Sequence, residues 1–321
     1  MDSSSWKAFG EIDPELKALF ASYVQQAAEA SFNNPVDLKN TYGISKSEIQ
    51  IPVRDGSTIR AVVYRPMSEI SGALFGAVYY HGGGFVVGTP ELWEHGAVIM
   101  VQQLGCTVVN VDYRLAPEHT FPTAALDAID ALHWAAANTS SIGADASKGF
   151  IVGGTSAGGN LAAVAAHSAV DSRLEPAPTG VYLSMPLLLH HHAIPEQWKP
   201  HLNSFEQNKD AMILNRQDIL WFYDQYQPKP KSHLISPLLW PSGHKGQPPT
   251  YFQICGMDPL RDDALLYEHV LHEEYGVPTK KDIYSGIPHG GTDFLIAMPT
   301  LVYKALQDAK EGVEWLLNSA V

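Results

Sequence analysis

Residues 149–167 read GFIVGGTSAGGNLAAVAAH, and this stretch decides the fold. A short strand-like run ends in G-x-S-x-G at residues 154–158, and an apolar helical run follows it directly. Gly154 and Gly158 flank the serine because a Cβ would clash where a strand and a helix approach closely. The pattern predicts a tight strand–turn–helix that holds Ser156 in a strained conformation with its hydroxyl exposed, as a nucleophile requires.

Short β-rich runs alternate with helical stretches from about residue 47 to the end of the chain. This alternation predicts an α/β fold with a mostly parallel central sheet and helices on both faces. Asp55-Gly56 is a hairpin turn signal, so an antiparallel pair should open the sheet. The predicted strands are residues 47–53, 58–64, 76–80, 107–111, 149–153, 180–184, 251–255 and 280–284, and the predicted helices include 124–137, 158–170 and 264–275.

Two segments interrupt this alternation. Residues 1–45 have the pattern of one or two amphipathic helices, and residues from about 187 to 247 form a long insertion with several prolines. A connection of that length is usually a lid or a cap, although an insertion that only extends the core is the alternative. The predicted organisation is N-terminal cap helices at 1–45 and a catalytic domain at 46–321 that carries the cap insertion.

Composition narrows the class of protein. The chain has 321 residues, of which 45% are hydrophobic, and this suffices for one large core. A formal net charge of -13 repels phosphate backbones, so we expect no nucleic-acid partner. The N-terminal residues lack the apolar core of a leader, and no run of about 18 apolar residues could give stable membrane insertion. Cys106 and Cys255 lie in strand-like runs, which indicates buried thiols and a cytoplasmic location.

A glycine run follows the strand GAVYY as His81-Gly82-Gly83-Gly84. Acyl transfer creates an oxyanion that needs backbone N–H donors already aimed at it, and glycines allow the backbone to approach. A phosphate-binding loop is the alternative, but neither GK[ST] nor a fitting GxGxxG pattern is present. His81 is expected to orient its own loop by a hydrogen bond.

A serine nucleophile needs an imidazole base that is oriented by a carboxylate. In the order Ser, acid, His, the candidates are Asp258 in GMDPL after the strand YFQIC, and His289 in IPHGG after KKDIY. Both follow the ends of late strands, where ligands bind in open α/β sheets. Asp262 and Asp263 instead open a predicted helix, where carboxylates cap free N–H groups.

With these residues in place, the chain resembles the hormone-sensitive-lipase branch of the α/β-hydrolases, which includes plant carboxylesterases and many microbial esterases. The resemblance covers nearly everything from residue 47 onward. It implies an α/β-hydrolase fold with a helical cap, and a serine carboxylic ester hydrolase that cleaves short- to medium-chain acyl esters without a cofactor. The matching stretches are YYHGGGFVVG, VDYRLAPEHTFPTAALDA, GGTSAGGN, GMDPLRDDA and IPHGG.

The resemblance also implies roles for individual residues. Ser156, Asp258 and His289 would form a catalytic triad. The backbone amides of Gly83, Gly84 and Ala157 would form the oxyanion hole. The sequence departs from the family pattern at Thr155, where many members carry Asp, and at GGTDF after His289, where HGF is usual. We expect the first departure to change loop packing and the second to reshape the loop of the base.

Three further motifs bear on the site and on the loops around it. His190-His191-His192 could suggest a metal site, but adjacent residues are not expected to face one ion, so we predict none. Arg114 is expected to brace its loop by pairing with Glu118. Trp221-Phe222-Tyr223 would either line the substrate pocket or pin the cap to the body.

Other functions remain compatible with these motifs. A biosynthetic enzyme could use the same triad for lactonisation, acyl transfer or ring closure. A non-catalytic receptor of the same fold is less favoured, because such receptors lack the catalytic histidine and His289 is present. The expected partner is a small-molecule ester, and a homodimer is compatible with the sequence.

Overall fold

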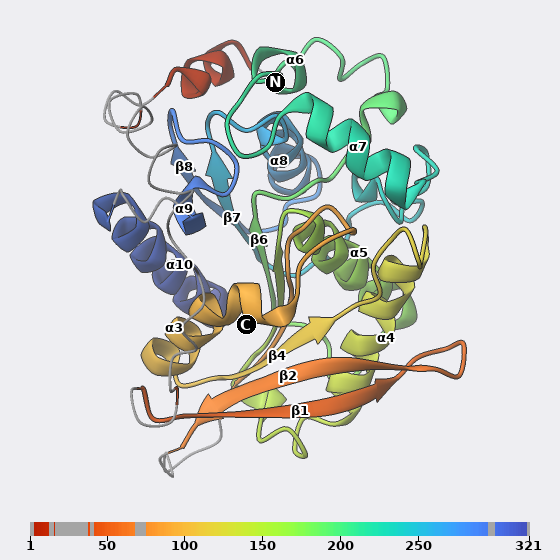
Figure 1. The fold of residues 1–321 in the computed structure, drawn as a ribbon, viewed down its shortest axis with the longest axis vertical. Coiled ribbons are helices and arrows are strands. Elements are labelled where there is room, and N and C mark those ends of the chain that lie inside the picture. The colour runs from red at the N-terminus through yellow and green to blue at the C-terminus, as the bar shows by residue number, and fades with distance from the viewer. Residues whose placement is uncertain are drawn as a thin grey trace.

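An eight-stranded sheet organises the part of the chain that the computed structural model describes, namely residues 3–12, 16, 38, 42–67, 75–294 and 299–319 (Figure 1). The strand order is β1-β2-β4-β3-β5-β6-β7-β8. The strands are β1 (Ile44–Pro52), β2 (Thr58–Pro66), β3 (Gly76–Tyr80), β4 (Thr107–Asp112), β5 (Phe150–Thr155), β6 (Gly180–Ser184), β7 (Thr250–Cys255) and β8 (Thr279–Tyr284).

The sheet is mostly parallel, as predicted. β1 pairs with β2, and β2 with β4, in antiparallel register, whereas every pair from β4 to β8 is parallel. All residues of β3, β5, β6 and β7 are buried, because helices cover both faces of a parallel sheet. The predicted strands are all present, and only their ends differ from the prediction.

Helices pack on both faces of this sheet (Figure 1). One hydrophobic core joins the sheet to α4, α5 and α8, and a second joins it to α3 and α10. The buried side of α4 and α5 is largely alanine, which lets the two helices lie close together and close to the strands. The bounds are α3 (Glu94–Leu104), α4 (Thr123–Ala137), α5 (Ala157–Ser172), α8 (Arg261–His269) and α10 (Pro299–Ser319).

The prediction of one helix at 264–275 was wrong at both ends. α8 begins at Arg261 and ends at His269, and the π-helical turn η6 (Val270–Glu274) continues it. The earlier start follows from the loop before it, in which the N–H of Arg261 already donates to the carbonyl of Asp258 at 3.1 Å.

The insertion between β6 and β7 contains two short helices, α6 (Ser204–Gln207) and α7 (Arg216–Tyr226). They lie at the end of the sheet where the parallel strands finish, at the top of Figure 1. The 3-10 helix η1 (Ser4–Gly10) lies beside α6, where Gln207 Nε2 donates to the carbonyl of Lys7 at 2.8 Å. Most of the remaining N-terminal segment, for which helices are predicted, lies outside the described residues.

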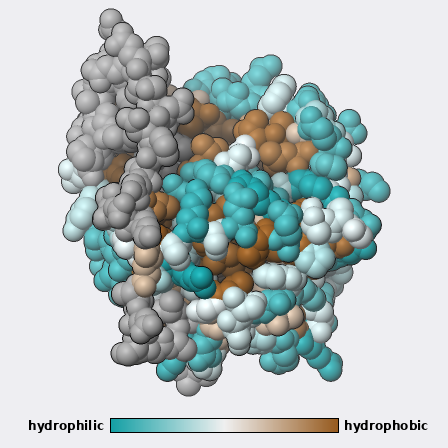
Figure 2. Space-filling model, turned by 60° about the horizontal axis from the view of Figure 1, so that its bottom comes forward, coloured by the Kyte–Doolittle hydropathy of each residue, from teal (hydrophilic) through white to brown (hydrophobic). Residues whose placement is uncertain are grey.

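Charged side chains shield the edge strand β1. Lys46 pairs with Glu94 at 2.5 Å, and Arg60 on β2 pairs with Glu48 at 2.8 Å. Such charges discourage pairing with a further strand. Figure 2, which turns this end of the molecule forward, shows a surface on which hydrophilic residues predominate and hydrophobic ones gather in smaller areas. None of the helices in the described ranges is long and apolar enough to cross a bilayer.

Candidate active site

Ser156 lies in the turn between β5 and α5, at the carboxyl edge of the sheet. Its backbone has φ 57° and ψ -118°, a left-handed conformation that strains a residue with a side chain. A Cβ on Gly158 would lie 1.9 Å from the carbonyl oxygen of Tyr80, so only glycine fits there. The N–H of Ser156 donates to the carbonyl of Ser184 on β6 at 2.8 Å. The predicted turn is therefore present. The close approach of Gly158 to β3 and the hydrogen bond to β6 fix the position of the serine.

The structure brings the other two predicted residues to this serine. His289 Nε2 lies 2.9 Å from Ser156 Oγ, and His289 Nδ1 lies 2.7 Å from Asp258 Oδ2. Because a carboxylate only accepts, Nδ1 carries the proton and Nε2 is left as the acceptor for the serine hydroxyl. Asp258 and His289 are both buried, and they come from the loops after β7 and β8.

Residues that the sequence did not reveal hold Asp258 and His289 in place. Asp258 Oδ1 accepts from the N–H of Leu260 at 2.8 Å, and Asn208 Nδ2 donates to the carbonyl of Asp258 at 2.9 Å. Beside the base, the N–H of Gly290 contacts Met185 Sδ at 2.9 Å. Met185 follows β6 directly, which is a positional signal, but its φ of 47° could not be read from the sequence.

The glycine loop after β3 lies beside Ser156. Gly83 has φ 121°, and a Cβ there would lie 1.9 Å from the carbonyl oxygen of Val87. No hydrogen bond of the described residues uses the N–H of Gly83 or Gly84. Ala157 begins α5, and the first N–H groups of a helix have no acceptor within it. The loop and the helix start therefore offer free donors near the serine.

His81 orients this loop, as predicted. Its Nδ1 donates to the carbonyl of Gly82 at 2.7 Å, and its ring stacks on Tyr113 at 4.3 Å. Tyr113 in turn donates its hydroxyl proton to the carbonyl of His81 at 2.8 Å. Burial lowers the pKa of His81, so the ring is a neutral support for the loop.

A cavity of about 350 Å³ opens at Ser156, and we call it the ester cavity. Gly84 and Ala157 form part of its wall beside the serine. Of the three consecutive aromatic residues on α7, Phe222 and Tyr223 line the cavity, whereas Trp221 is 48% exposed. The remaining wall is apolar and includes Phe85, Leu187, Leu214, Ile219 and Leu260.

Thr155, the first departure from the family pattern, packs between neighbouring elements. Its hydroxyl lies 2.7 Å from the hydroxyl of Tyr79 on β3, and both side chains are buried. A Cβ on Gly82 would lie 3.6 Å from the Thr155 methyl group. Thr155, directly before Ser156, therefore contacts both β3 and the glycine loop, which agrees with a change in loop packing.

The predicted pair between Arg114 and Glu118 was wrong. Arg114 instead binds Asp127 on α4 at 2.6 Å and Asp55 in the β1–β2 turn at 2.7 Å, and Glu118 is exposed. Asp127 is buried, so it offers a better site for a guanidinium than an exposed glutamate. Arg114 still braces its loop, but through other carboxylates.

The expectation that Asp262 and Asp263 cap α8 was also wrong. Asp262 Oδ2 accepts from the N–H groups of Asn203 and Ser204 at 2.7 and 2.8 Å, and Asp262 Oδ1 accepts from Arg261 at 2.8 Å. Asp263 Oδ2 accepts from the N–H groups at positions 188 and 189 at 3.4 and 3.2 Å. Both carboxylates therefore anchor the insertion to the start of α8.

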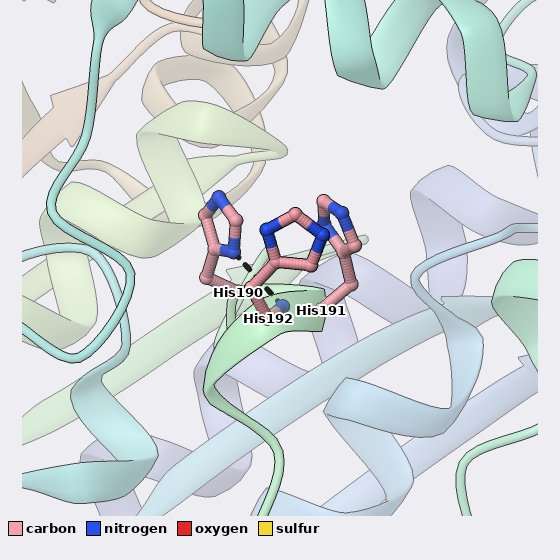
Figure 3. A group of neighbouring side chains, drawn as sticks. All are labelled: His190, His191 and His192. Carbon is pink, nitrogen blue, oxygen red and sulfur yellow. Dashed lines mark hydrogen bonds between the residues drawn. The ribbon is translucent and has the colours of Figure 1, made fainter.

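The three consecutive histidines project from one turn toward α7 (Figure 3). One ring nitrogen of each lies within 4.8 Å of the others, because the 3-10 turn brings the three side chains together. The rings of His190 and His191 are nevertheless stacked at 4.6 Å with planes 17° apart. Since an imidazole binds a metal in its own plane, two parallel rings do not converge on one ion. His190 Nδ1 also already accepts from the N–H of His192 at 3.1 Å.

The stack favours neutral rings. His190 stacks on Tyr223 at 4.1 Å, and His191 stacks on Phe205 at 4.8 Å. Burial and the neighbouring imidazoles lower the pKa of His190 to about 3 and that of His191 to about 4. A protonated ring in this stack would lose hydration and face its neighbours' partial charges.

We predict that this stack makes the folded protein sensitive to acid. Between the ordinary pKa of 6.5 and about 3, the unfolded chain binds a proton at His190 that the folded chain does not. The stability from the neutral ring is therefore complete above pH 6.5 and falls as the pH falls through this window. The melting temperature between about pH 7.5 and about pH 5 should fall less steeply for His190→Phe than for the wild type. The exposed His119→Gln serves as the control, and an equal slope in all three proteins would contradict the prediction.

Known proteins resemble this chain in sequence and in structure. A family model described as the alpha/beta hydrolase fold matches residues 77–293. A versiconal hemiacetal acetate esterase of Dothistroma septosporum is 31% identical, covering 95% of this chain and 88% of that protein. The crystal structure of vibralactone cyclase has a TM-score of 0.86 at 31% identity and covers 98% of this chain and 97% of that one. A Pyrobaculum calidifontis esterase has a TM-score of 0.76 at 32% identity and covers 100% of this chain and 94% of that one.

Proposed function

The chain belongs to the α/β-hydrolase family, and from that premise we propose that it is a serine carboxylesterase whose nucleophile is Ser156. The observation that carries the proposal is the continuous hydrogen-bonded path from Ser156 Oγ through His289 to Asp258. Its relatives include esterases from a fungus and an archaeon, which supports hydrolysis of esters.

The proposed mechanism begins with attack by Ser156 Oγ on the ester carbonyl carbon. His289 Nε2 takes the serine proton and then gives it to the departing alcohol, while Asp258 stabilises the imidazolium. A water molecule, activated by the same imidazole, then releases the acid and restores the serine. These steps require only groups of this chain and a water molecule.

The free N–H groups of Gly83, Gly84 and Ala157 would bind the oxyanion that forms during both attacks. They are fixed by the loop and the helix start before the reaction begins, so they cost no reorganisation as the charge develops. Removal of one such donor typically lowers kcat by about 10²–10³. Backbone donors cannot be removed by ordinary substitution, which is why the triad residues provide the sharper tests.

We predict that the ester cavity restricts the length of the acyl chain. Phe222 and Leu214 are part of the apolar wall that bounds this cavity, so a long acyl chain would have to displace them. On nitrophenyl esters from acetate to palmitate, kcat/KM should be highest for short or medium chains and should fall for palmitate. No activation should occur at a lipid–water interface. A maximum on emulsified long-chain triglyceride would contradict this prediction and would indicate a lipase.

Ring closure is a second candidate function, favoured by the similarity to vibralactone cyclase. An acyl group on Ser156 could be attacked by a hydroxyl of its own chain in place of water, with His289 as the base in either case. Product analysis separates the two functions, because hydrolysis releases a free acid whereas ring closure releases a lactone. A receptor without catalysis is disfavoured by the bond between His289 and Ser156.

We also propose a cytoplasmic location. Cys106 and Cys255 are both buried thiols, and neither forms a disulfide. Proteins with buried, reduced cysteines are typical of reducing compartments. Fractionation of cells that express the tagged chain tests this proposal, and recovery in the secreted fraction would contradict it.

A further inference from the structure

We propose that Arg261 is a positioning residue: its guanidinium, together with the N-terminal turn η1, holds the loops of Asp258 and His289 in alignment. The inference rests on the proposed esterase function, because the two aligned side chains are those that would act on Ser156. The side chain of Arg261 donates to groups at three places, namely the start of α8, the loop of Asp258 and the end of α6.

Arg261 is fully buried, although its guanidinium is always charged. Its Nε donates to Asp262 Oδ1 at 2.8 Å, its Nη1 to the carbonyl of Gly256 at 3.0 Å, and its Nη2 to Gln207 Oε1 at 3.0 Å. A buried ion pair contributes little stability beyond that of apolar side chains of similar size. A planar guanidinium does fix the directions of its partners, so this one holds three acceptors relative to one another.

The loop that carries Asp258 is bound by Arg261 at two points. Nη1 donates to the carbonyl of Gly256, and the backbone N–H of Arg261 donates to the carbonyl of Asp258 at 3.1 Å. Asn208 Nδ2, directly after α6, donates to the same carbonyl at 2.9 Å. The backbone at Asp258 is therefore fixed, and this sets where its Oδ2 meets His289 Nδ1.

The loop that carries His289 runs beside the loop of Asp258. The N–H of Gly256 donates to the carbonyl of Tyr284 at 2.8 Å. The N–H of Met257 donates to the carbonyl of Ile287 at 2.9 Å. Because Gly256 is bound to both Arg261 and the second loop, a shift of the guanidinium would move both loops.

The turn η1 is joined to this arrangement at two places. The carbonyl of Phe9 accepts from the N–H of Gly286 at 2.8 Å, and a Cβ on Gly256 would lie 2.0 Å from that carbonyl oxygen. Gln207 Nε2 donates to the carbonyl of Lys7 at 2.8 Å, while the Gln207 amide oxygen accepts from the guanidinium. The N-terminal turn therefore braces both the guanidinium and the loop of His289.

Loss of this alignment should appear in kcat. Neither Arg261 nor any residue of η1 lines the ester cavity, so substrate binding does not use them directly. An interaction that matters only in the reacting step lowers kcat and leaves KM unchanged. A misplacement of about 1 Å at a reacting centre can cost about 10²-fold in rate.

The first test is Arg261→Lys, assayed on nitrophenyl butanoate. Lysine keeps a charge for Asp262, but a single ammonium group on a flexible stem cannot hold three segments in set directions. The kcat should fall at least about tenfold while KM stays within about twofold. Arg60→Lys is the matched control, because Arg60 on β2 also binds three acceptors but lies toward the other end of the strand order from β7.

A proton NMR signal separates positioning from stability. The Nδ1–H of His289, in its 2.7 Å bond to Asp258, should give a resonance far downfield, identified by its loss in Asp258→Asn. The resonance should move upfield or broaden in Arg261→Lys and stay in place in Arg60→Lys. In Arg261→Ala, millimolar guanidinium should restore part of kcat, whereas sodium chloride and urea at equal concentration should not.

Gln207→Leu tests the connection to η1 without changing a buried charge. Gln207 is exposed, so this variant should fold even if both variants at Arg261 do not. Its kcat should fall about threefold, because it removes one acceptor from the guanidinium and one donor from η1. Gln217→Leu on α7, also exposed, is the control and should keep the kcat of the wild type.

Four outcomes would overturn the inference while leaving the esterase function intact. These are a lower melting temperature of Arg261→Lys with unchanged kcat, an effect on KM in place of kcat, an unchanged downfield resonance, and an unchanged kcat in Gln207→Leu. Failure of the wild type to hydrolyse any ester, with no labelling of Ser156 by a fluorophosphonate, would instead reject the proposed function itself.

Discussion

Replacement of Ser156 by alanine is expected to lower kcat on a nitrophenyl ester by about 10⁶, the scale at which a triad nucleophile acts. The variant keeps the oxyanion donors and the cavity, so weak residual catalysis above water should remain. The fold should not change, because the backbone of the turn is fixed by its glycines and by the bond from Ser156 N–H to Ser184. KM should change far less than kcat.

A fluorophosphonate should label the wild type at Ser156 and abolish its activity. Ser168→Ala is the matched control, since Ser168 lies on the same helix α5 but does not line the ester cavity. Mass spectrometry of the labelled peptide identifies the serine. Labelling at another serine, or near-wild-type turnover in Ser156→Ala, would show that the nucleophile lies elsewhere.

Asp258→Asn should preserve the fold and lower kcat by about 10⁴. Asparagine can donate to His289 Nδ1, which places the imidazole proton on Nε2 and removes the acceptor that Ser156 needs. The bonds that hold residue 258, from the N–H of Leu260 and from Asn208, remain available. The melting temperature should therefore stay close to that of the wild type.

Asp262→Asn should instead lower the stability of the fold and change kcat much less. Arg261 is fully buried, and Asp262 is its only carboxylate partner in the described chain. Breaking one side of a buried pair costs about 3–5 kcal/mol, so the loss should appear in unfolding by denaturant more than in kcat on a short ester. Purified Asp258→Asn and Asp262→Asn are compared by melting temperature and turnover. A folded, inactive Asp262→Asn beside an active Asp258→Asn would mean that the acid is misassigned.

The sequence predicts the sheet and the meeting of Ser156, Asp258 and His289 for one reason. Buried parallel strands such as β3 and β6 are short apolar runs bounded by turns, and their bounds match the prediction. Since Ser156, Asp258 and His289 follow the ends of β5, β7 and β8, correct strands also place these three residues at one edge of the sheet. The chain order Ser, acid, His, which is typical of this fold, then selects these three residues from the others.

The remaining contacts could not be predicted because they join segments that are far apart in the sequence. Asp262 meets Asn203, and Arg114 meets Asp127, through the folding of loops that carry no periodic pattern. Met185 acts through a left-handed backbone that no residue preference indicates. The N-terminal prediction stays largely a prediction, because most of residues 13–41 lie outside the described chain.

The anchors of the insertion also have a consequence for how such enzymes diversify. Asp262 accepts from backbone N–H groups at 203–204, and Asp263 accepts from those at 188–189. Phe222 and Tyr223, which line the ester cavity, lie further along the loop on α7. The anchors and the aromatic wall on α7 therefore occupy separate stretches of one loop. Mutations can accumulate on α7, or the helix can be exchanged between relatives, while the attachment points keep the loop in place beside Ser156.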